Sequence, residues 1–139
     1  DHMARLPQPL GLNHPAVKIV EHLLAQGRAW LKLSGAYLDS QVGEAGDFLD
    51  IDAVARHLVT VAPQRLVWGS DWPHPNHTHV PDDGELVSSL AAIAPKPDVL
   101  HQLMVDSLKQ VLIIFLQLLL DISTVMMLLH YSLWVKWLT

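Results

Sequence analysis

Apolar residues recur every three or four positions in several stretches of the first hundred residues, which is the spacing of one helical face. These stretches predict helices over 15–27, 51–61 and 83–94, and a fourth helix from about residue 98. Asn13 or His14 would cap the first helix, and Asp50 would cap the second. In the second helix, Val54, Val61 and either His57 or Leu58 are expected to be buried.

Two short apolar runs lie on either side of the second predicted helix. Ala29–Leu33 and Leu66–Trp68 are both followed closely by glycine, and both are typical of buried strands. Two strands joined through a helix of about a dozen residues form a βαβ unit, in which the strands run parallel. The predicted fold class is therefore α/β.

The C-terminal part has no helical stripe of this kind. From Val111 to Leu138 apolar residues fall on every face of a helix, as they do in core or membrane helices. The stretch is long enough to span a bilayer, but Asp121 argues against this, since an intramembrane carboxylate costs about 2.5 to 3.5 kcal/mol. Three interpretations stay open: packing on a sheet or an oligomer partner, a marginal membrane span, and translated sequence foreign to the fold.

Composition narrows the possible partners and chemistry. The chain has no cysteine, which excludes disulfides and thiolate metal sites and leaves histidine as the side chain for nitrogen ligation. Its net charge is −5 and it has no basic stripe with interleaved aromatics, so nucleic acid is not an expected partner. No secretory signal is visible at the N-terminus, and a cytoplasmic location is expected.

The strongest candidate for chemistry follows the second predicted strand. The strand is expected to end at Gly69 and Ser70, and Pro73 prevents a β-sheet ladder or a helix from continuing beyond them. Asp71 is therefore expected at the carboxyl end of a strand, where α/β barrels carry catalytic groups. The structural alternative is a turn aspartate that stabilises the bend at Pro73.

Three stretches carry a family resemblance. They are Asp1-His2-Met3-Ala4-Arg5, Lys32-Leu33-Ser34-Gly35-Ala36-Tyr37 and Trp68-Gly69-Ser70-Asp71-Trp72-Pro73-His74-Pro75. In letters, order and spacing they resemble the amidohydrolase-related (amidohydrolase 2) family of TIM-barrel hydrolases, particularly its dicarboxylate lactonase-like branch. The resemblance covers residues 1–106 and implies the C-terminal half of a (β/α)₈ barrel. Residues 107–139 do not match the family and are expected to form an apolar helical tail, and the chain could self-associate through residues 108–139.

The resemblance implies hydrolysis of a lactone or an amide. In the family pattern Asp71 is the general base on the attacking water, and His2 contacts the scissile carbonyl or a metal. Zinc or manganese serves some relatives and the lactonase-like ones need no metal, so no metal site is assigned; His2 and Asp71 would be the ligands. Further substrate contacts are expected from Arg5, Ser34, Tyr37, Trp72 and His74.

Each of these side chains also has a structural interpretation. His2 could be a solvated terminal histidine, and Arg5 a surface charge. Ser34 and Tyr37 could form a glycine turn with a packed tyrosine. The loop histidines have no visible carboxylate to orient them, so they are expected to be solvated rather than bound to metal; they are His74, His77 and His79.

The sequence departs from the family at several points. The His-x-His pair of the first barrel strand is missing, and His77-Thr78-His79 lies downstream of the general base. Leu38 replaces an arginine that holds a substrate carboxylate, which argues against a dicarboxylate. Ser107-Leu108 replaces an Asn-Pro turn. We expect a small carboxylated lactone or related acid as substrate, with little or no activity from this chain alone. The alternative is a non-catalytic α/β half-barrel that assembles or anchors through its C-terminal helix.

Overall fold

The computed structural model of the chain describes residues 1–74 and 81–138, without the side chains of 44 and 129–138. It divides the chain into two compact units, which we call unit 1 (Asp1–Ser107) and unit 2 (Leu108–Thr139). Each unit is described by itself.

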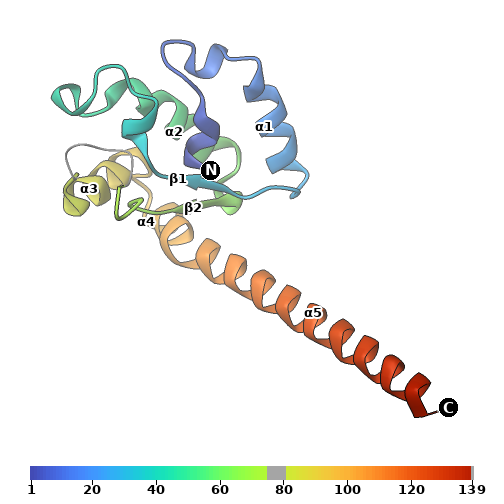
Figure 1. The fold of residues 1–139 in the computed structure, drawn as a ribbon. Helices are drawn as coiled ribbons and strands as arrows, with labels where there is room; N and C mark the ends of the chain where they lie inside the picture. The colour runs from blue at the N-terminus through green and yellow to red at the C-terminus, as the bar shows by residue number, and fades with distance from the viewer. Residues whose placement is uncertain (75–80, 139) are drawn as a thin grey trace. The chain divides into compact units, whose positions relative to one another are not determined.

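Short strands alternate with helices along unit 1 (Figure 1). The elements are α1 (Ala16–Ala25), β1 (Leu31–Leu33), α2 (Leu49–Val61), β2 (Leu66–Trp68), α3 (Asp83–Ile93) and α4 (Pro97–His101). Single turns of 3₁₀ helix lie at His2–Arg5, Gly11–Asn13, Ala36–Leu38, Glu44–Gly46 and Pro63–Arg65, and a π-helical turn, Gln102–Asp106, leads into α5 (Ser107–Leu138).

The two strands form a parallel pair. Leu31 lies opposite Leu66 and Leu33 opposite Trp68, with α2 as the connection between the strands. The predicted βαβ unit and the α/β class are therefore confirmed. Within the described residues the sheet has two strands. Because the strands are parallel, the carboxyl ends of β1 and β2 lie side by side.

One face of this sheet belongs to the core. Leu31, Leu33 and Leu66 are buried, whereas Lys32, which alternates with them, points to the opposite face. The buried side chains of α2 that join the core cluster are Ile51, Val54, Ala55 and Leu58. α2 also contacts α1 and α3, so the three helices pack together around this core. The opposite face carries Lys32 and its register partner Val67.

The predicted boundaries of α1 are close to the observed ones. The Nδ1 atom of His14 accepts a hydrogen bond from the backbone N–H of Ala16 at 3.2 Å, as a capping side chain does. At the other end Gly27, with φ +66°, and Arg28 donate to the carbonyls of Leu24 and Leu23. This is the Schellman arrangement, in which glycine adopts the left-handed conformation most readily.

Two expectations for α2 are wrong. Asp50 does not cap the helix: its carboxylate accepts hydrogen bonds from Ser40 Oγ at 2.5 Å and from the backbone N–H of Gln41 at 2.7 Å. Asp50 thus ties the preceding loop to the helix, whose cap position is held by Phe48. Val61 is 46% exposed, because it lies at the edge of the buried stripe in the last turn of α2.

Unit 2 consists of the main part of α5. The helix runs without a break to Leu138. Within the described residues, the continuous helical stretch Pro97–Leu128 is long and apolar enough to cross a membrane by length and composition, and it contains an 18-residue window with a mean hydropathy of 2.4.

Candidate active site

The N-terminal turn places His2 beside the end of β1. His2, Met3, Ala4 and Arg5 all have positive φ angles, between 46° and 61°. A left-handed conformation costs a non-glycine residue about 1–2 kcal/mol, so the rest of unit 1 must hold this turn in place. Met3 supplies such an anchor, since it is buried in the core cluster. The strained turn carries the imidazole to Ser34, the first residue after β1, at 3.0 Å.

Asp71 is held at the end of β2 by two donors. The Lys32 ammonium lies 3.1 Å from its Oδ1 atom, and the Tyr37 hydroxyl donates to its Oδ2 atom at 2.7 Å. Asp71 has φ 72°, a left-handed conformation that aspartate tolerates better than most residues. Among the described residues its carboxylate makes no hydrogen bond to the turn backbone, so the structural alternative of a turn-stabilising aspartate has no support there.

These contacts keep Asp71 ionised. Burial alone would raise its pKa, but the hydrogen bonds from Tyr37 and Lys32 and the positive charge nearby outweigh burial and lower the pKa below its ordinary value. Conversely, burial and the hydrogen bond to Asp71 raise the pKa of Tyr37 to about 12. Tyr37 therefore remains a hydrogen-bond donor at neutral pH. A carboxylate oxygen has two lone pairs, so Oδ2 can still accept a proton from water.

His2 is a neutral imidazole in this environment. Burial, followed by the positive charges of Lys32 and the N-terminal amine, lowers its pKa although Asp71 acts in the opposite direction. Its Nε2 atom lies 3.2 Å from the Asp1 carboxylate, which only accepts hydrogen bonds, so we assign the proton to Nε2. The Nδ1 atom then accepts from Ser34 and lies 3.6 Å from Asp71.

Lys32 is the functional candidate that the motif comparison did not single out. Its Nζ atom contacts Asp71 at 3.1 Å and Asp1 at 3.7 Å, and Lys32 thereby joins two acidic groups. The sequence does contain an indication of this role, because Lys32 is a charged residue between two leucines of a predicted strand. Since alternate strand residues point to opposite faces, such a residue faces away from the core.

His74 was expected to be solvated, and this expectation is wrong. The residue is 2% exposed, and its ring packs edge-on against Tyr37 with 6.0 Å between ring centroids. Neither ring nitrogen has a hydrogen-bond partner among the described residues, although Nε2 lies 3.6 Å from the Asp83 carboxylate. His77 and His79 lie outside the described residues.

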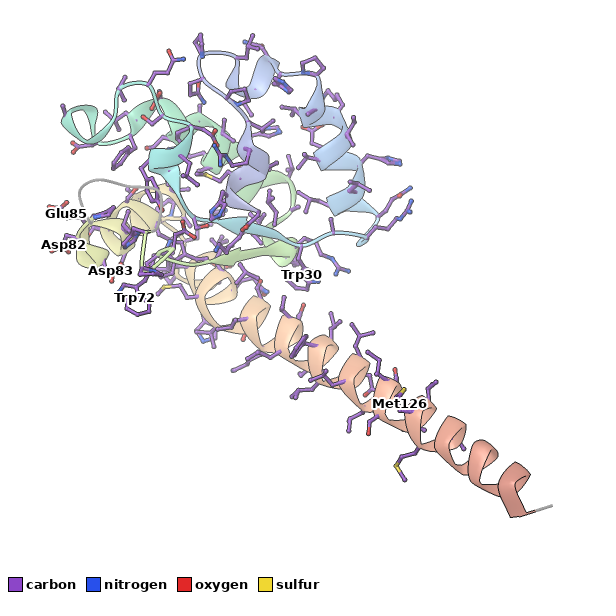
Figure 2. All side chains as sticks on the ribbon, in the orientation of Figure 1. Trp30, Trp72, Asp82, Asp83, Glu85 and Met126 are labelled. Atoms are coloured by element: carbon purple, nitrogen blue, oxygen red, sulfur yellow. The ribbon has the colours of Figure 1, made fainter. Side chains whose placement is uncertain are left out.

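The other predicted substrate contacts divide into two groups. Ser34 and Tyr37 belong to the cluster around Asp71. Arg5 is instead paired with Asp39, its Nε atom lying 2.8 Å from Oδ2, and Trp72 is 74% exposed (Figure 2). The structure therefore brings His2, Ser34, Tyr37 and Asp71 together. Arg5, Trp72 and His74 stay predicted substrate contacts.

A cavity of about 370 Å³ lies at the strand ends. It is lined by α2, α3 and the ends of both strands, mainly through apolar side chains such as Leu33, Ile51 and Trp68. Neither Asp71 nor Tyr37 is among its described lining residues, but Ser34, which contacts His2, is one of them. The polar cluster therefore adjoins this cavity through Ser34.

The described residues do not bring together enough ligands to hold a metal ion by themselves. A catalytic zinc ion needs about three protein ligands, and no group of three His, Asp or Glu side chains converges in the part of the chain that the structure describes. His2 and Asp71 would provide two. No step of the proposed reaction is assigned to a metal.

The role of Lys32 can be tested directly. We expect Lys32→Met to raise the pKa of Asp71, because burial then acts against one donor fewer. Since the lowered pKa contributes stability above about pH 3.8 that is lost as the pH falls through the folded value, the variant should lose less stability on acidification. At neutral pH the loss should stay within about 1 kcal/mol, as for partly exposed ion pairs.

The measurement is an acid titration of the Asp71 carboxyl carbon by NMR. Lys18→Met is the matched control, because Lys18 is paired with Glu21 on α1 and does not contact Asp71. Equal titration curves for Asp71 in both variants would contradict the assigned role of Lys32.

Comparisons with known proteins agree with the motifs. The Amidohydrolase family model matches residues 1–107. Over 110 residues the chain is 37% identical to a 4-sulfomuconolactone hydrolase of Rhizobium radiobacter; this alignment covers 77% of the chain and 36% of that protein. Over 66 residues the chain is 44% identical to a 2-pyrone-4,6-dicarboxylate hydrolase of Comamonas testosteroni; this alignment covers 47% of the chain and 22% of that protein.

Solved structures give the same result. The crystal structure of a putative 2-pyrone-4,6-dicarboxylic acid hydrolase from Pseudomonas putida is similar with a TM-score of 0.65 and 28% identity, over 79% of this chain and 40% of that one. The chain spans less than half the length of the relatives that it matches. From its motifs, fold and relatives together, the chain belongs to the amidohydrolase family, in the lactonase-like branch.

Proposed function

We propose that unit 1 is part of a lactone hydrolase in which Asp71 is the general base. The observation that carries this proposal is the carboxylate at the end of β2, held ionised by Lys32 and Tyr37 with His2 next to it. The parallel pair β1–β2, with helices on its apolar face, supports its placement in a partial (β/α)₈ barrel. Barrel enzymes carry their chemistry at the carboxyl ends of the strands, where Asp71 lies.

The proposed reaction is addition of water to the lactone carbonyl. Asp71 takes a proton from the water as its oxygen bonds to the carbonyl carbon, and negative charge moves to the carbonyl oxygen. The Nε2–H group of His2 is the donor proposed to face that oxygen, in place of its present partner Asp1. When the intermediate collapses, the ring C–O bond breaks and the leaving oxygen receives the proton from Asp71.

The ionisation state of Asp71 suits both halves of this reaction. At neutral pH the lowered pKa leaves the group fully ionised and able to accept a proton. After proton transfer the same environment makes the carboxylic acid a ready donor to an alkoxide. Lys32 and Tyr37 then act as positioning residues, since they hold the two carboxylate oxygens in place.

The substrate proposed is a small lactone that carries an anionic group. The relatives are named for a sulfonated muconolactone and a pyrone dicarboxylate, both of which have anionic substituents. In this chain Leu38 occupies the position of a carboxylate-binding arginine, which argues against a second carboxylate. Arg5 is nearby, its Nη2 atom lying 3.5 Å from the Leu38 carbonyl oxygen, and would have to exchange Asp39 for the substrate.

The test is a chimera in which residues 1–107 replace the matching part of the Rhizobium 4-sulfomuconolactone hydrolase. We expect the chimera to hydrolyse the lactone and the 139-residue chain alone to show little or no turnover, because the His-x-His pair comes from the relative. Turnover is followed by the absorbance of the lactone, and folding by circular dichroism.

A folded chimera without turnover would contradict the proposal and favour the alternative, a non-catalytic α/β half-barrel that assembles or anchors through its C-terminal helix. Turnover by the 139-residue chain alone would contradict only the expected inactivity of that chain, and the role of Asp71 would then be tested by mutation.

A further inference from the structure

Apolar side chains surround α5 on all sides. Leu112, Ile113, Ile114, Phe115 and Leu116 are consecutive, and successive residues of an α-helix are turned by about 100°, so these five cover every face. Met126, labelled in Figure 2, projects from the same helix further along. A helix that packs on one protein surface needs only an apolar stripe. Since α5 is apolar on every face, an apolar environment on all sides of the helix would stabilise it best.

The length of the apolar part matches a bilayer. Val111 to Leu129 is on the order of 28 Å long at a rise of about 1.5 Å per residue, against a hydrocarbon core of roughly 30 Å. Lys109 precedes this stretch. Tyr131, Trp134 and Lys136 follow it in sequence, and these residue types are common at membrane interfaces.

Asp121 is the charged residue within this stretch, and the helix gives it a partner. Gln117, one turn earlier, donates from Nε2 to its Oδ1 atom at 3.2 Å. Thr124 likewise donates its hydroxyl to the carbonyl oxygen of Leu120 at 2.9 Å. These hydrogen bonds do not remove the charge of Asp121, so its cost of about 2.5 to 3.5 kcal/mol has to be outweighed by the apolar side chains at the other positions of the stretch.

We propose that α5 is a membrane-spanning anchor, with lipid hydrocarbon around Val111–Leu129 and unit 1 in water. A second copy of the chain is the competing partner. Two paired helices would cover one face of each and leave the opposite faces, which are equally apolar, in water. Lipid covers all faces at once.

The test uses the full chain reconstituted into vesicles of phosphatidylcholine and phosphatidylglycerol. Because the chain has no cysteine, single-cysteine variants report on one position each. We expect flotation with the vesicles and resistance to carbonate extraction. Leu120→Cys should be protected from a water-soluble maleimide, whereas Lys109→Cys and Lys136→Cys should each react in the copies whose labelled end faces outward. All three should react in detergent.

Two matched double variants separate insertion from general stickiness. Ile113→Asp with Val125→Asp adds two charges inside the stretch and should abolish flotation. Leu10→Asp with Val61→Asp adds the same charges at exposed positions of unit 1 and should leave flotation unchanged. Circular dichroism of both variants reports whether unit 1 stays folded.

Several outcomes would overturn the anchor. One is a full chain that stays in the soluble fraction, as a monomer or as an oligomer by light scattering, and the oligomer would identify a second copy as the partner. Another is ready modification of Leu120→Cys in intact vesicles, which would place α5 on the membrane surface. A third is flotation that survives in the Ile113→Asp, Val125→Asp variant.

Discussion

Asp71→Asn in the chimera should lower kcat for lactone hydrolysis by about 10² to 10⁴, the range of general acid–base catalysis. The amide keeps the size and can still accept from Tyr37, but it cannot take a proton from water. Substrate binding should change less than kcat, because the base acts on water rather than on the lactone. Steady-state kinetics on the chimera and its variant measure this split.

Asp98→Asn is the control for this variant. Asp98 is exposed in the first turn of α4, so the same chemical change there should leave kcat within a factor of about two. An Asp71→Asn chimera with nearly full activity would remove Asp71 from the reaction. The activity of the chimera itself would then need another base.

Leu66→Ala should destabilise unit 1 by about 2–5 kcal/mol, which is a large part of the roughly 5–15 kcal/mol that holds a domain folded. Leu66 is 0% exposed, and it lies in β2 opposite Leu31 of β1. The substitution removes apolar contacts and leaves a cavity between the sheet and its helices. Since Asp71 lies just beyond the end of β2, the loss would also loosen the candidate site.

Urea unfolding followed by tryptophan fluorescence measures this effect, in a mild detergent that keeps α5 dispersed. Leu10→Ala is the matched control, since Leu10 is 51% exposed and its truncation should cost no more than about 0.5 kcal/mol. Equal unfolding midpoints for the two variants would mean that β2 is not part of the cooperative core.

The order and type of the elements in unit 1 were predictable from the sequence. Helical spacing located α1, α2 and α3, and the apolar run Leu66–Trp68 is β2 to the residue. Patterns of this kind are local, because one buried face imposes its period on each element. The parallel pairing followed from the length of the connection, since a hairpin would have needed only a few residues.

Two of the three wrong expectations concern polar side chains that have several possible partners; the third is Val61, which lies at the exposed edge of the buried stripe of α2. Asp50 has the sequence position of a helix cap, yet Ser40 and Gln41, ten and nine residues away, take its carboxylate. His74 resembles a solvated loop histidine, yet Tyr37 packs against it. These partners come from other parts of the chain, so local pattern carries no signal for them.

Three properties could be read from the order of residues alone: α/β elements in a parallel arrangement, an aspartate at a strand end, and a C-terminal helix apolar on all faces. These properties follow from the period and direction of side chains within single elements. The contacts of Lys32 and Tyr37 with Asp71 could not be read in this way, because the side chains meet only when β1 and β2 pair and the turn after β1 folds back. Hydrogen bonds and ion pairs act over a few ångströms, whereas these residues are more than thirty positions apart in the sequence.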